Sequence, residues 1–321
     1  LCRAAAAAAG GTTTITEGLA VITFPKDAVF YNPPQVVNRD LSVLCLRTFL
    51  ELRAAAPPPP ARAAKRPRLE EDPAGKQEDP AGKEEGREFG AKKKPAVLDA
   101  LSASGLRAIR YVKEIPRLGD VVANDLDPNA TEAIRLNVKK NGIAEGAVTA
   151  QCGDAVDAMS GVENRGRFAA VDLDPYGSAA PFIDAAVRAV ESGGLLMLTC
   201  TDLAVLCGNH SEACFARYGA APVKGGGGNV HEMALRIVLG MVAAHAGKYG
   251  RTAKVLAAVK IDFYVRVFVV VSDDKRGVMG LGLQQGRVFL CNGCGSMATE
   301  RVGRVKGPAQ GQGGSFEEVF E

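Results

Sequence analysis

The sequence predicts a doubly wound α/β fold, in which helices cover both faces of a mostly parallel sheet. Two observations support this class: short apolar runs alternate with helical segments after residue 95, and Gly, Pro or Asn punctuates their ends. A third concerns the last two apolar runs, 254–263 and 265–272, which are too close together for a crossover helix. They are therefore expected to pair antiparallel and close the sheet.

The elements follow in order, starting with an ordered segment over 16–52. Asp127-Pro128 supplies an N-cap and a proline at the first helical position, and Asn141-Gly142 ends that helix. A further helix runs through Val190 and closes at Gly193-Gly194, and another spans 230–247. The predicted strands before the final pair are 96–101, 120–125, 147–152, 168–173 and 195–200, and a helix covers 105–115, before Pro116.

Composition indicates a globular intracellular protein. The chain has 321 residues, 47% hydrophobic and 23% charged, with a net charge of +3 that neither requires nor excludes a nucleic-acid partner. No apolar run is long enough for a transmembrane helix, so no membrane partner is expected. The eight cysteines are interpreted mainly as free thiols.

A change of composition divides the chain at residues 53–95. This stretch holds Pro57 to Pro60 and a repeated Glu-Asp-Pro-Ala-Gly-Lys sequence that begins at Glu71 and again at Glu78. Too few apolar groups are present to offset the ordering entropy, so a disordered insertion is predicted. Its basic run, Lys65 to Arg68, is either a nuclear import signal or a solvated patch.

Three acids at successive strand ends indicate a nucleoside cofactor. In a doubly wound sheet, ligands bind beyond the carboxyl ends of the strands, where Asp99, Asp125 and Asp154 are expected. Asp125 is placed to accept from ribose hydroxyls, and Asp154 from an adenine amine. The loop after Asp99 is rich in small residues but lacks the G-x-G-x-x-G fingerprint, which disfavours a nicotinamide-dependent oxidoreductase.

The fourth strand ends in Asp172-Leu173-Asp174-Pro175-Tyr176-Gly177. A carboxylate here, with a backbone carbonyl near the proline, can accept from the N–H of a conjugated amine and localise its lone pair toward a methyl donor. An aromatic face nearby can stack on a flipped base. We therefore interpret Asp174 as the catalytic carboxylate, in preference to an ordinary turn residue.

The chain resembles the tRNA guanine-26 N2-dimethyltransferase family over roughly 16–272, apart from the insertion. The resemblance rests on several stretches in the right order: Phe30-Tyr31-Asn32-Pro33 through Asn38-Arg39-Asp40-Leu41-Ser42, Ser102 to Tyr111, Asn124-Asp125, Asp172 to Gly177, Cys200-Thr201-Asp202, His231 to Arg236, and Asp262 with Tyr264 and Arg266.

This resemblance implies a Rossmann-like methyltransferase core that transfers one or two methyl groups from S-adenosylmethionine to a guanine N2 of tRNA. It implies Asp174 as the catalytic residue and Tyr176, Glu232 and Asp262 as weaker candidates for substrate contacts. Related amine methyltransferases carry the aromatic one position later than Tyr176, which leaves its stacking role open. The cofactor-binding positions implied are Arg39, Arg107, Asp125, Asp154 and Ala155.

Cys291 and Cys294 form a C-x2-C knuckle, half of a four-cysteine zinc site. No cysteine or histidine follows, so either the chain is truncated or the zinc site is lost, and zinc is expected only in a longer form. Cys207, His210 and Cys214 have ligand-like spacing but are interpreted as a structural loop.

Four regions are expected: an N-terminal part of the methyltransferase domain (1–52), the insertion (53–95), the core (96–275) and the start of a truncated RNA-binding or zinc region (276–321). tRNA is the expected partner, no DNA partner is expected, and the nucleus or mitochondrion is the expected location. Two alternatives stay open: a paralogue that methylates a different guanine or RNA, and an inactive form that binds RNA or a partner.

Overall fold

The computed structural model describes residues 11–25, 31–55, 94–223, 227–305 and 316–317. The predicted insertion and its basic run lie almost wholly outside these residues. Only the ends of the predicted stretch are described, and at its start the helix α1 (Val36–Ala55) continues to Ala55, past the predicted boundary at residue 52.

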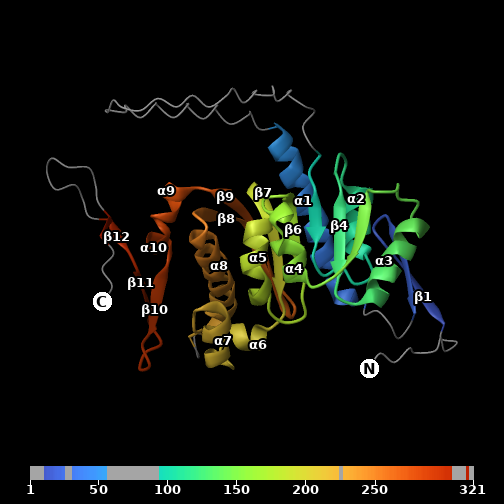
Figure 1. Cartoon of the computed structure of the whole chain (residues 1–321). Coiled ribbons are helices and arrows are strands. Elements are labelled where there is room, and N and C mark those ends of the chain that lie inside the picture. The colour runs from blue at the N-terminus through green and yellow to red at the C-terminus, as the bar shows by residue number, and fades with distance from the viewer. Residues whose placement is uncertain (1–10, 26–30, 56–93, 224–226, 306–315, 318–321) are drawn as a thin grey trace, which may run out of the picture.

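A seven-stranded sheet in the order β5-β4-β3-β6-β7-β9-β8 forms the centre of the molecule (Figure 1). Its first five strands run parallel, and β9 is antiparallel to both β7 and β8; the antiparallel pairing of β8 with β9 confirms the prediction for the last two runs. The strand bounds are β3 (Val97–Asp99), β4 (Val121–Asp125), β5 (Val148–Cys152), β6 (Phe168–Leu173), β7 (Val190–Cys200), β8 (Arg251–Ile261) and β9 (Tyr264–Asp273).

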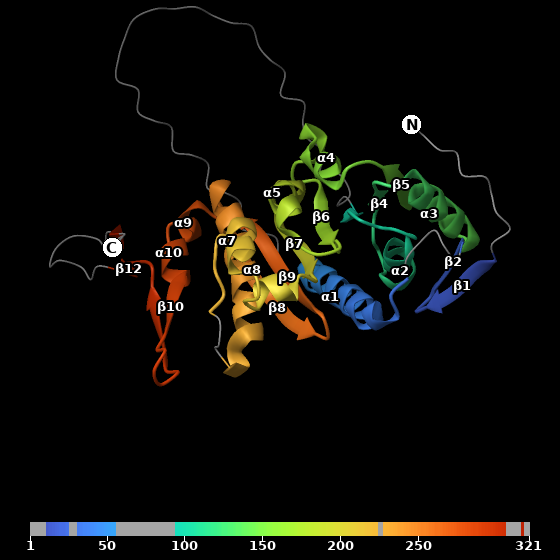
Figure 2. The same cartoon turned by 90° about the horizontal axis from the view of Figure 1, so that it is seen from below.

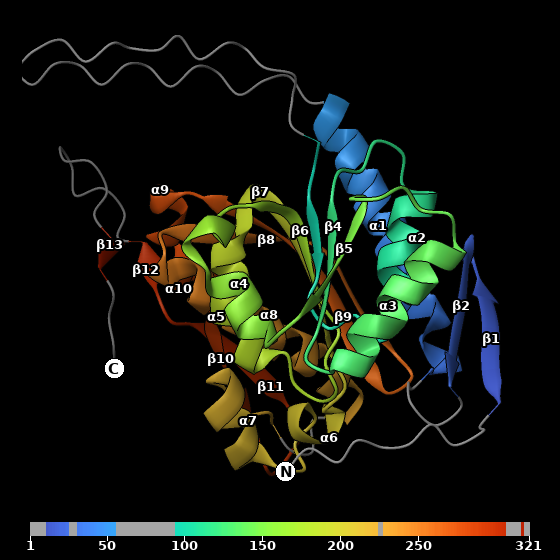
Figure 3. The ribbon, with the colours of Figure 1, turned by 45° about the vertical axis from the view of Figure 1, so that its right-hand side comes forward.

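Helices cover both faces of this sheet (Figure 3). One face packs against α1, α2 (Leu106–Glu114) and α3 (Pro128–Lys140) in a core that includes Leu46, Tyr111 and Phe268. The other packs against α4 (Ala155–Ser160), α5 (Ala180–Ala189) and α8 (Val230–Lys248). Alternate residues of β9 serve the two faces, because Val265 and Val267 belong to the second core.

The predicted boundary between the helix before Val190 and the next strand is also wrong. We expected a helix through Val190 that stops at Gly193-Gly194, but the helix ends at Ala189 and β7 begins at Val190. Val190 pairs with Phe168, and the register then shifts before Leu195 pairs with Ala170. Gly193, at φ +76°, supplies the backbone conformation of this irregularity, so the two glycines lie inside the strand.

Several short elements were not predicted from the sequence. Strands β1 (Thr12–Glu17) and β2 (Ala20–Pro25) form a hairpin whose Ala20 and Ile22 pack on Leu106 and Ile109 of α2. Two short helices, α6 (Leu203–Leu206) and α7 (Ser211–Tyr218), follow β7. No helix within the described ranges combines the length and apolar character that a membrane span requires.

After the sheet come α9 (Lys275–Val278), α10 (Leu281–Gln284) and a hairpin of β10 (Gly286–Leu290) and β11 (Met297–Arg301). A further short pair joins β12 (Arg304–Val305) to β13 (Phe316–Glu317). The β10–β11 hairpin and the β1–β2 hairpin lie at opposite ends of the molecule (Figure 1, Figure 2).

Candidate active site

The candidate site lies at the carboxyl edge of the parallel strands. Asp99 ends β3, Asp125 ends β4 and Asp174 follows β6 directly. Asp154 comes two residues after the end of β5. The topology therefore brings the acids predicted from separate strand ends to one edge of the sheet, beside the switch in strand order at β3 and β6.

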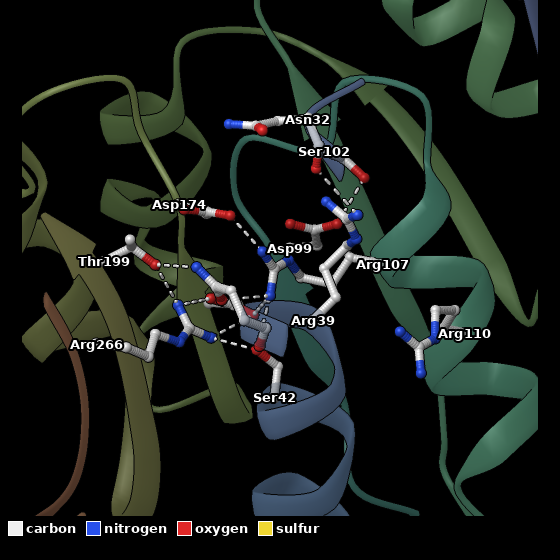
Figure 4. Close-up of polar contacts among 12 residues, drawn as sticks. Asn32, Arg39, Ser42, Asp99, Ser102, Arg107, Arg110, Asp174, Thr199 and Arg266 are labelled. Carbon is white, nitrogen blue, oxygen red and sulfur yellow. Dashed lines mark hydrogen bonds and ion pairs between the residues drawn. The ribbon is translucent and has the colours of Figure 1, made fainter. Parts of the chain in front are cut away.

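Asp174 is held by Arg107, the first arginine of α2. The two side chains are 10% and 7% exposed and form a direct ion pair, drawn in Figure 4. The second carboxylate oxygen of Asp174, Oδ1, is buried and has no hydrogen-bond partner among the described residues. Asp174 thus presents a fixed orientation and one unused acceptor atom.

Behind Asp174 lies a fully buried pair, Asp172 and Arg266. Arg266 Nη1 is 2.8 Å from Asp172 Oδ1, and neither side chain is exposed. Tyr111 donates to the same carboxylate, and Arg107 Nη1 lies 3.4 Å from it. Burial alone would raise the pKa of Asp172, but Arg107 and Arg266 outweigh it and hold that pKa below its usual value. The anion in turn keeps Arg107 charged, because burial opposes that charge while Asp172 and Asp174 raise the pKa of Arg107 well above normal.

Two polar side chains of helix α1, Asn38 and Ser42, form hydrogen bonds with this cluster. Ser42 Oγ accepts from Arg107 at 2.7 Å and from Arg266 at 2.8 Å. Asn38 Nδ2 donates to Thr199 Oγ1 at 3.2 Å, and Thr199 also accepts from Arg266 at 2.9 Å. These contacts, visible in Figure 4, fix α1 over the edge of the sheet and give Arg107 a single arrangement.

Asp99 is buried beside the small-residue loop. It accepts from Ser102 Oγ at 2.7 Å and is 1% exposed. Burial raises its pKa to about 7, although the charge of Arg107 acts against the rise. The loop itself holds Ala103 at φ +49° and Gly105 at φ +78°. The φ of Gly105 favours glycine, and a Cβ there would lie 3.2 Å from the Ile134 side chain, a tight contact that Ile134 would have to relieve by a small shift.

Asp125 and Asp154 bind backbone amides in the structure. Asp125 accepts from the Ala103 N–H at 2.8 Å and from the Asp127 N–H at 3.0 Å, which joins the ends of β3 and β4. Asp154 accepts from the Val156 N–H at 2.7 Å and caps α4, where Ala155 is the first, buried residue. Each carboxylate oxygen has a second lone pair, so these bonds leave room for a ligand donor.

Arg39 points from α1 toward Asn32 and the end of β3, close to Ser102 (Figure 4). Its guanidinium is bound at two points by Glu17 of the β1–β2 hairpin, at 2.7 and 2.6 Å, and it is 7% exposed. Burial raises the pKa of Glu17, but Arg39 outweighs that effect and the net pKa is lowered. The hairpin therefore anchors a residue that we predicted as cofactor-binding.

The remaining predicted contacts are peripheral to this cluster. Tyr176 is 83% exposed in the loop after Asp174. Glu232 is exposed in the first turn of α8 and pairs with Arg236 one turn on, at 2.8 Å. Asp262 is exposed in the turn between β8 and β9, at φ +43°. For Tyr176, Glu232 and Asp262, a direct contact with the substrate therefore stays a prediction.

The cysteine knuckle lies on the β10–β11 hairpin, at the far end of the molecule. Cys291 and Cys294 are exposed, and hydrogen bonds from Ser296 lower the pKa of Cys294 to about 7. Within the described ranges no group of three or more metal-ligating side chains is close enough to hold a metal ion. Near the ligand-like spacing of Cys207, His210 and Cys214, Cys207 Sγ lies 3.7 Å from His231 Nδ1. The interpretation of this segment as a structural loop stays a prediction.

Several residues of the cluster were not assigned a role from the sequence: Glu17, Asn38, Ser42, Tyr111, Asp172, Thr199 and Arg266. A signal existed for Arg266, since an arginine inside the apolar run Val265 to Val271 must be paired if that strand is buried. Asp172 lies in a similar apolar run on β6. No pattern connected the two, because they are 94 residues apart.

The strand order, the antiparallel β9 and the acids along one edge define the class of protein: a Rossmann-like methyltransferase fold. The sequence profile of the N2,N2-dimethylguanosine tRNA methyltransferase family matches residues 10–316, so the chain belongs to this family.

Similar proteins include the tRNA (guanine(26)-N(2))-dimethyltransferases of Caenorhabditis elegans, 45% identical over 89% of this chain, and of Mus musculus, 40% identical over 93%. The matches cover 52% and 47% of those proteins, so the chain spans about half the length of the curated relatives that it matches.

Among solved structures, Trm1 from Pyrococcus horikoshii in complex with S-adenosyl-L-methionine superposes with a TM-score of 0.72 at 29% identity. That match covers 96% of this chain and 73% of the other. Trm5b from Pyrococcus abyssi, at a TM-score of 0.50 and 16% identity, covers 83% of this chain and 58% of the other, and shares the fold alone.

Proposed function

We propose that the chain transfers methyl groups from S-adenosylmethionine to the exocyclic N2 of a guanine in tRNA, at position 26. The observation that carries the proposal is Asp174, which follows β6 directly, is 10% exposed and pairs with Arg107; its buried Oδ1 has no hydrogen-bond partner among the described residues. The family and the names of its relatives supply the substrate, because proteins 45% and 40% identical are called tRNA (guanine(26)-N(2))-dimethyltransferases.

The residues at this edge fit the cofactor. The loop from Ser102 to Gly105 is built of small residues and held in positive-φ conformations, which lets a ligand approach the backbone. In this proposal Asp125 accepts from the ribose hydroxyls, and Asp154, with Ala155, binds the adenine. Arg39 and Arg107 supply cations for a carboxylate. When bound, the cofactor supplies a methyl group on a positively charged sulfur.

In this mechanism Asp174 accepts a hydrogen bond from the guanine amine and then its proton. An exocyclic amine is a poor nucleophile because its lone pair is delocalised into the ring, and an aligned carboxylate localises that pair. The pair Asp172–Arg266 holds Arg107, and Arg107 holds Asp174, so the acceptor is oriented before substrate arrives. Tyr176 is exposed and available to stack on a base that has left its helix.

The test is transfer of labelled methyl from S-adenosylmethionine to unmodified tRNA, with the product nucleoside identified by mass spectrometry. Asp174→Asn is expected to lower turnover by roughly 10²- to 10⁴-fold. Cofactor affinity, measured by calorimetry, should be retained, because Arg107 keeps Asp172 as a partner. Asp120→Asn is the matched control, since Asp120 is exposed at the opposite edge of the sheet and should leave turnover unchanged.

Two outcomes would contradict the proposal. Wild-type turnover in Asp174→Asn would remove Asp174 from the reaction. Cofactor binding without transfer to any tRNA, also in a longer chain of the relatives' length, would favour an inactive form that binds RNA. A methylated guanine at another position would indicate a paralogue with a different target.

We further propose that zinc binds Cys291 and Cys294 only in a longer form that brings a second pair of ligands, as a knuckle supplies half of a tetrahedral site. Zinc content of both lengths, measured by atomic absorption, tests this.

We also propose a nuclear location that depends on Lys65 to Arg68, with the mitochondrion as the alternative, since a yeast relative is named mitochondrial. Imaging of a tagged chain with these basic residues replaced tests it.

A further inference from the structure

Tyr264 is the first residue of β9 and lies at the same edge of the sheet as Asp174. Strand β9 runs antiparallel to β7, so its start is adjacent to the carboxyl end of β7, where Val265 pairs with Cys200. Side chains alternate along a strand, so Tyr264 shares a face with Arg266, which contacts Asp172 and Ser42. The tyrosine therefore sits one step nearer the edge than the buried ion pair behind the catalytic acid.

The hydroxyl of Tyr264 is buried without a partner. The residue is 0% exposed, and Oη has no hydrogen-bond partner among the described residues. The ring itself is well packed and meets Phe263 edge to face, with centroids 5.6 Å apart. Most buried polar atoms in native proteins are paired, and leaving one unpaired is costly, so an orphan hydroxyl beside a reaction site calls for a functional reason.

The surroundings make this hydroxyl a hydrogen-bond donor. Burial raises the pKa of Tyr264, and the negative charges of Asp174 and Asp262 raise it further against the opposing charges of Arg266 and Arg107. The phenol therefore stays neutral and keeps its proton at physiological pH. A neutral hydroxyl with no acceptor can donate to a ligand.

Asp174 Oδ1 is the complementary orphan. It is a buried acceptor, and it too has no hydrogen-bond partner within the part of the chain that the structure describes, so these residues present one acceptor and one donor without partners. On guanine, the 2-amino group is a donor, and the ring nitrogen N3 next to it is an acceptor. A carboxylate that accepts from the amine and a hydroxyl that donates to N3 together match this edge of the base.

We propose that Tyr264 is a specificity-determining residue whose hydroxyl donates a hydrogen bond to N3 of the target guanine, while Asp174 accepts from its 2-amino group. This inference rests on the proposed function. The pairing orients the amine toward the methyl donor and selects a purine with an acceptor beside its 2-amino group. It also gives a role to a buried hydroxyl that has no hydrogen-bond partner among the residues described in the structure.

The experiment compares Tyr264→Phe with wild type on two tRNAs: unmodified tRNA, and the same tRNA with 3-deazaguanosine at the target position. The deaza base keeps the 2-amino group but lacks the N3 acceptor. With the natural base, kcat/KM is expected to fall roughly tenfold in Tyr264→Phe, the effect of one neutral hydrogen bond. With the deaza base, wild type should be slowed and the variant should show no further loss.

Two measurements separate this role from a structural one. Thermal stability of Tyr264→Phe should equal or exceed that of wild type, because the lost hydroxyl has no hydrogen-bond partner in the described parts of the chain. Cofactor affinity should be unchanged. Tyr249→Phe is the matched control: Tyr249 Oη donates to Asp184 on the surface at 2.8 Å, so its loss should leave kcat/KM unaltered on both tRNAs.

Three results would overturn the inference: equal kcat/KM for wild type and Tyr264→Phe on natural tRNA, an equal loss on both tRNAs, or a weakened cofactor affinity that accounts for the loss. Failure of the proposed function looks different, because wild type itself would then transfer no methyl group to natural tRNA while binding the cofactor.

Discussion

Replacing Glu17 by glutamine is expected to destabilise the fold and to loosen a predicted cofactor-binding residue at the same time. Glu17 is the last residue of β1 in the N-terminal hairpin, and the residue is 6% exposed. Oε1 accepts from Arg39 at 2.7 Å and from Arg110 at 2.8 Å, and Oε2 accepts from Arg39 at 2.6 Å and from Tyr31 at 3.0 Å. Four donors therefore converge on one buried anion.

The magnitude follows from what each partner retains. Arg110 keeps ion pairs with Glu114 at 2.9 Å and with Asp40 at 2.7 Å, so it stays compensated. Arg39 keeps only a long hydrogen bond to the Asn32 carbonyl, at 3.4 Å, among its described polar contacts. Breaking a buried ion pair by removing one partner costs about 3–5 kcal/mol, and we expect a loss near 3 kcal/mol because only one of the two arginines is left without an anion.

The assay is urea unfolding followed by far-UV circular dichroism, since the chain has no tryptophan to report on unfolding by fluorescence. A double-mutant cycle with Arg39→Met isolates the pair, because removal of both partners also removes the uncompensated charge. Glu132→Gln is the matched control: its pair with Arg135 is 3.1 Å long but exposed, and its loss should cost about 0.5 kcal/mol or less.

The pH dependence gives a second check with a definite sign. The pKa of Glu17 is lowered in the folded state from its ordinary value of 4.5, chiefly by Arg39, so its contribution to stability is present above that value and is lost as pH falls through the lower, folded value. The difference between wild type and Glu17→Gln should therefore shrink below about pH 4.5. A loss under about 1 kcal/mol at neutral pH, or a coupling energy near zero, would refute this reasoning.

Three further predictions follow from single contacts. Burial raises the pKa of Asp99 to about 7, so protonated Asp99 stabilises the fold at low pH, and this contribution is lost as pH rises from about 4 to 7. The stability of Asp99→Asn relative to wild type should therefore increase by roughly 1 kcal/mol per pH unit in that window and level off above it. Parallel curves of unfolding free energy against pH for the two proteins would contradict this. Asp127→Ala removes the cap bond to the Asn129 N–H, 2.8 Å, and should cost about 1 kcal/mol in urea unfolding, with no loss if that bond contributes nothing. Gly105→Ala should lower the melting temperature, because alanine at φ +78° is strained and its Cβ would lie 3.2 Å from Ile134; an unchanged melting temperature would show that the loop can relax.

Much of the fold was predictable because its signals are local. Strand β6 was predicted with its observed bounds, and α3 begins after the expected Asp127 cap. The antiparallel pair β8–β9 followed from the short distance between two apolar runs. The hairpin β1–β2 was missed although its β-branched residues and Gly18 turn were present, because half of its residues are polar and it pairs with no other strand of the described chain.

The candidate site also contains residues whose positions were predictable from the sequence and partners that were not. Asp125, Asp154 and Asp174 could be placed at one edge because parallel strands align their carboxyl ends, which is a consequence of topology alone. Their partners could not. Arg107 binds Asp174 across 67 residues of chain, and no local pattern links the two.

By itself, then, the sequence determined the alternation of strands and helices, the acids at the strand ends and the family resemblance, because these depend on neighbouring residues and on the period of the backbone. Only the tertiary structure decided which groups meet: that Glu17 binds Arg39, that Arg266 binds Asp172, and that no described residue hydrogen-bonds to Tyr264 Oη or Asp174 Oδ1. The physical reason is that a buried charge or hydroxyl is defined by what surrounds it in space, and those groups come from elements far apart in the chain.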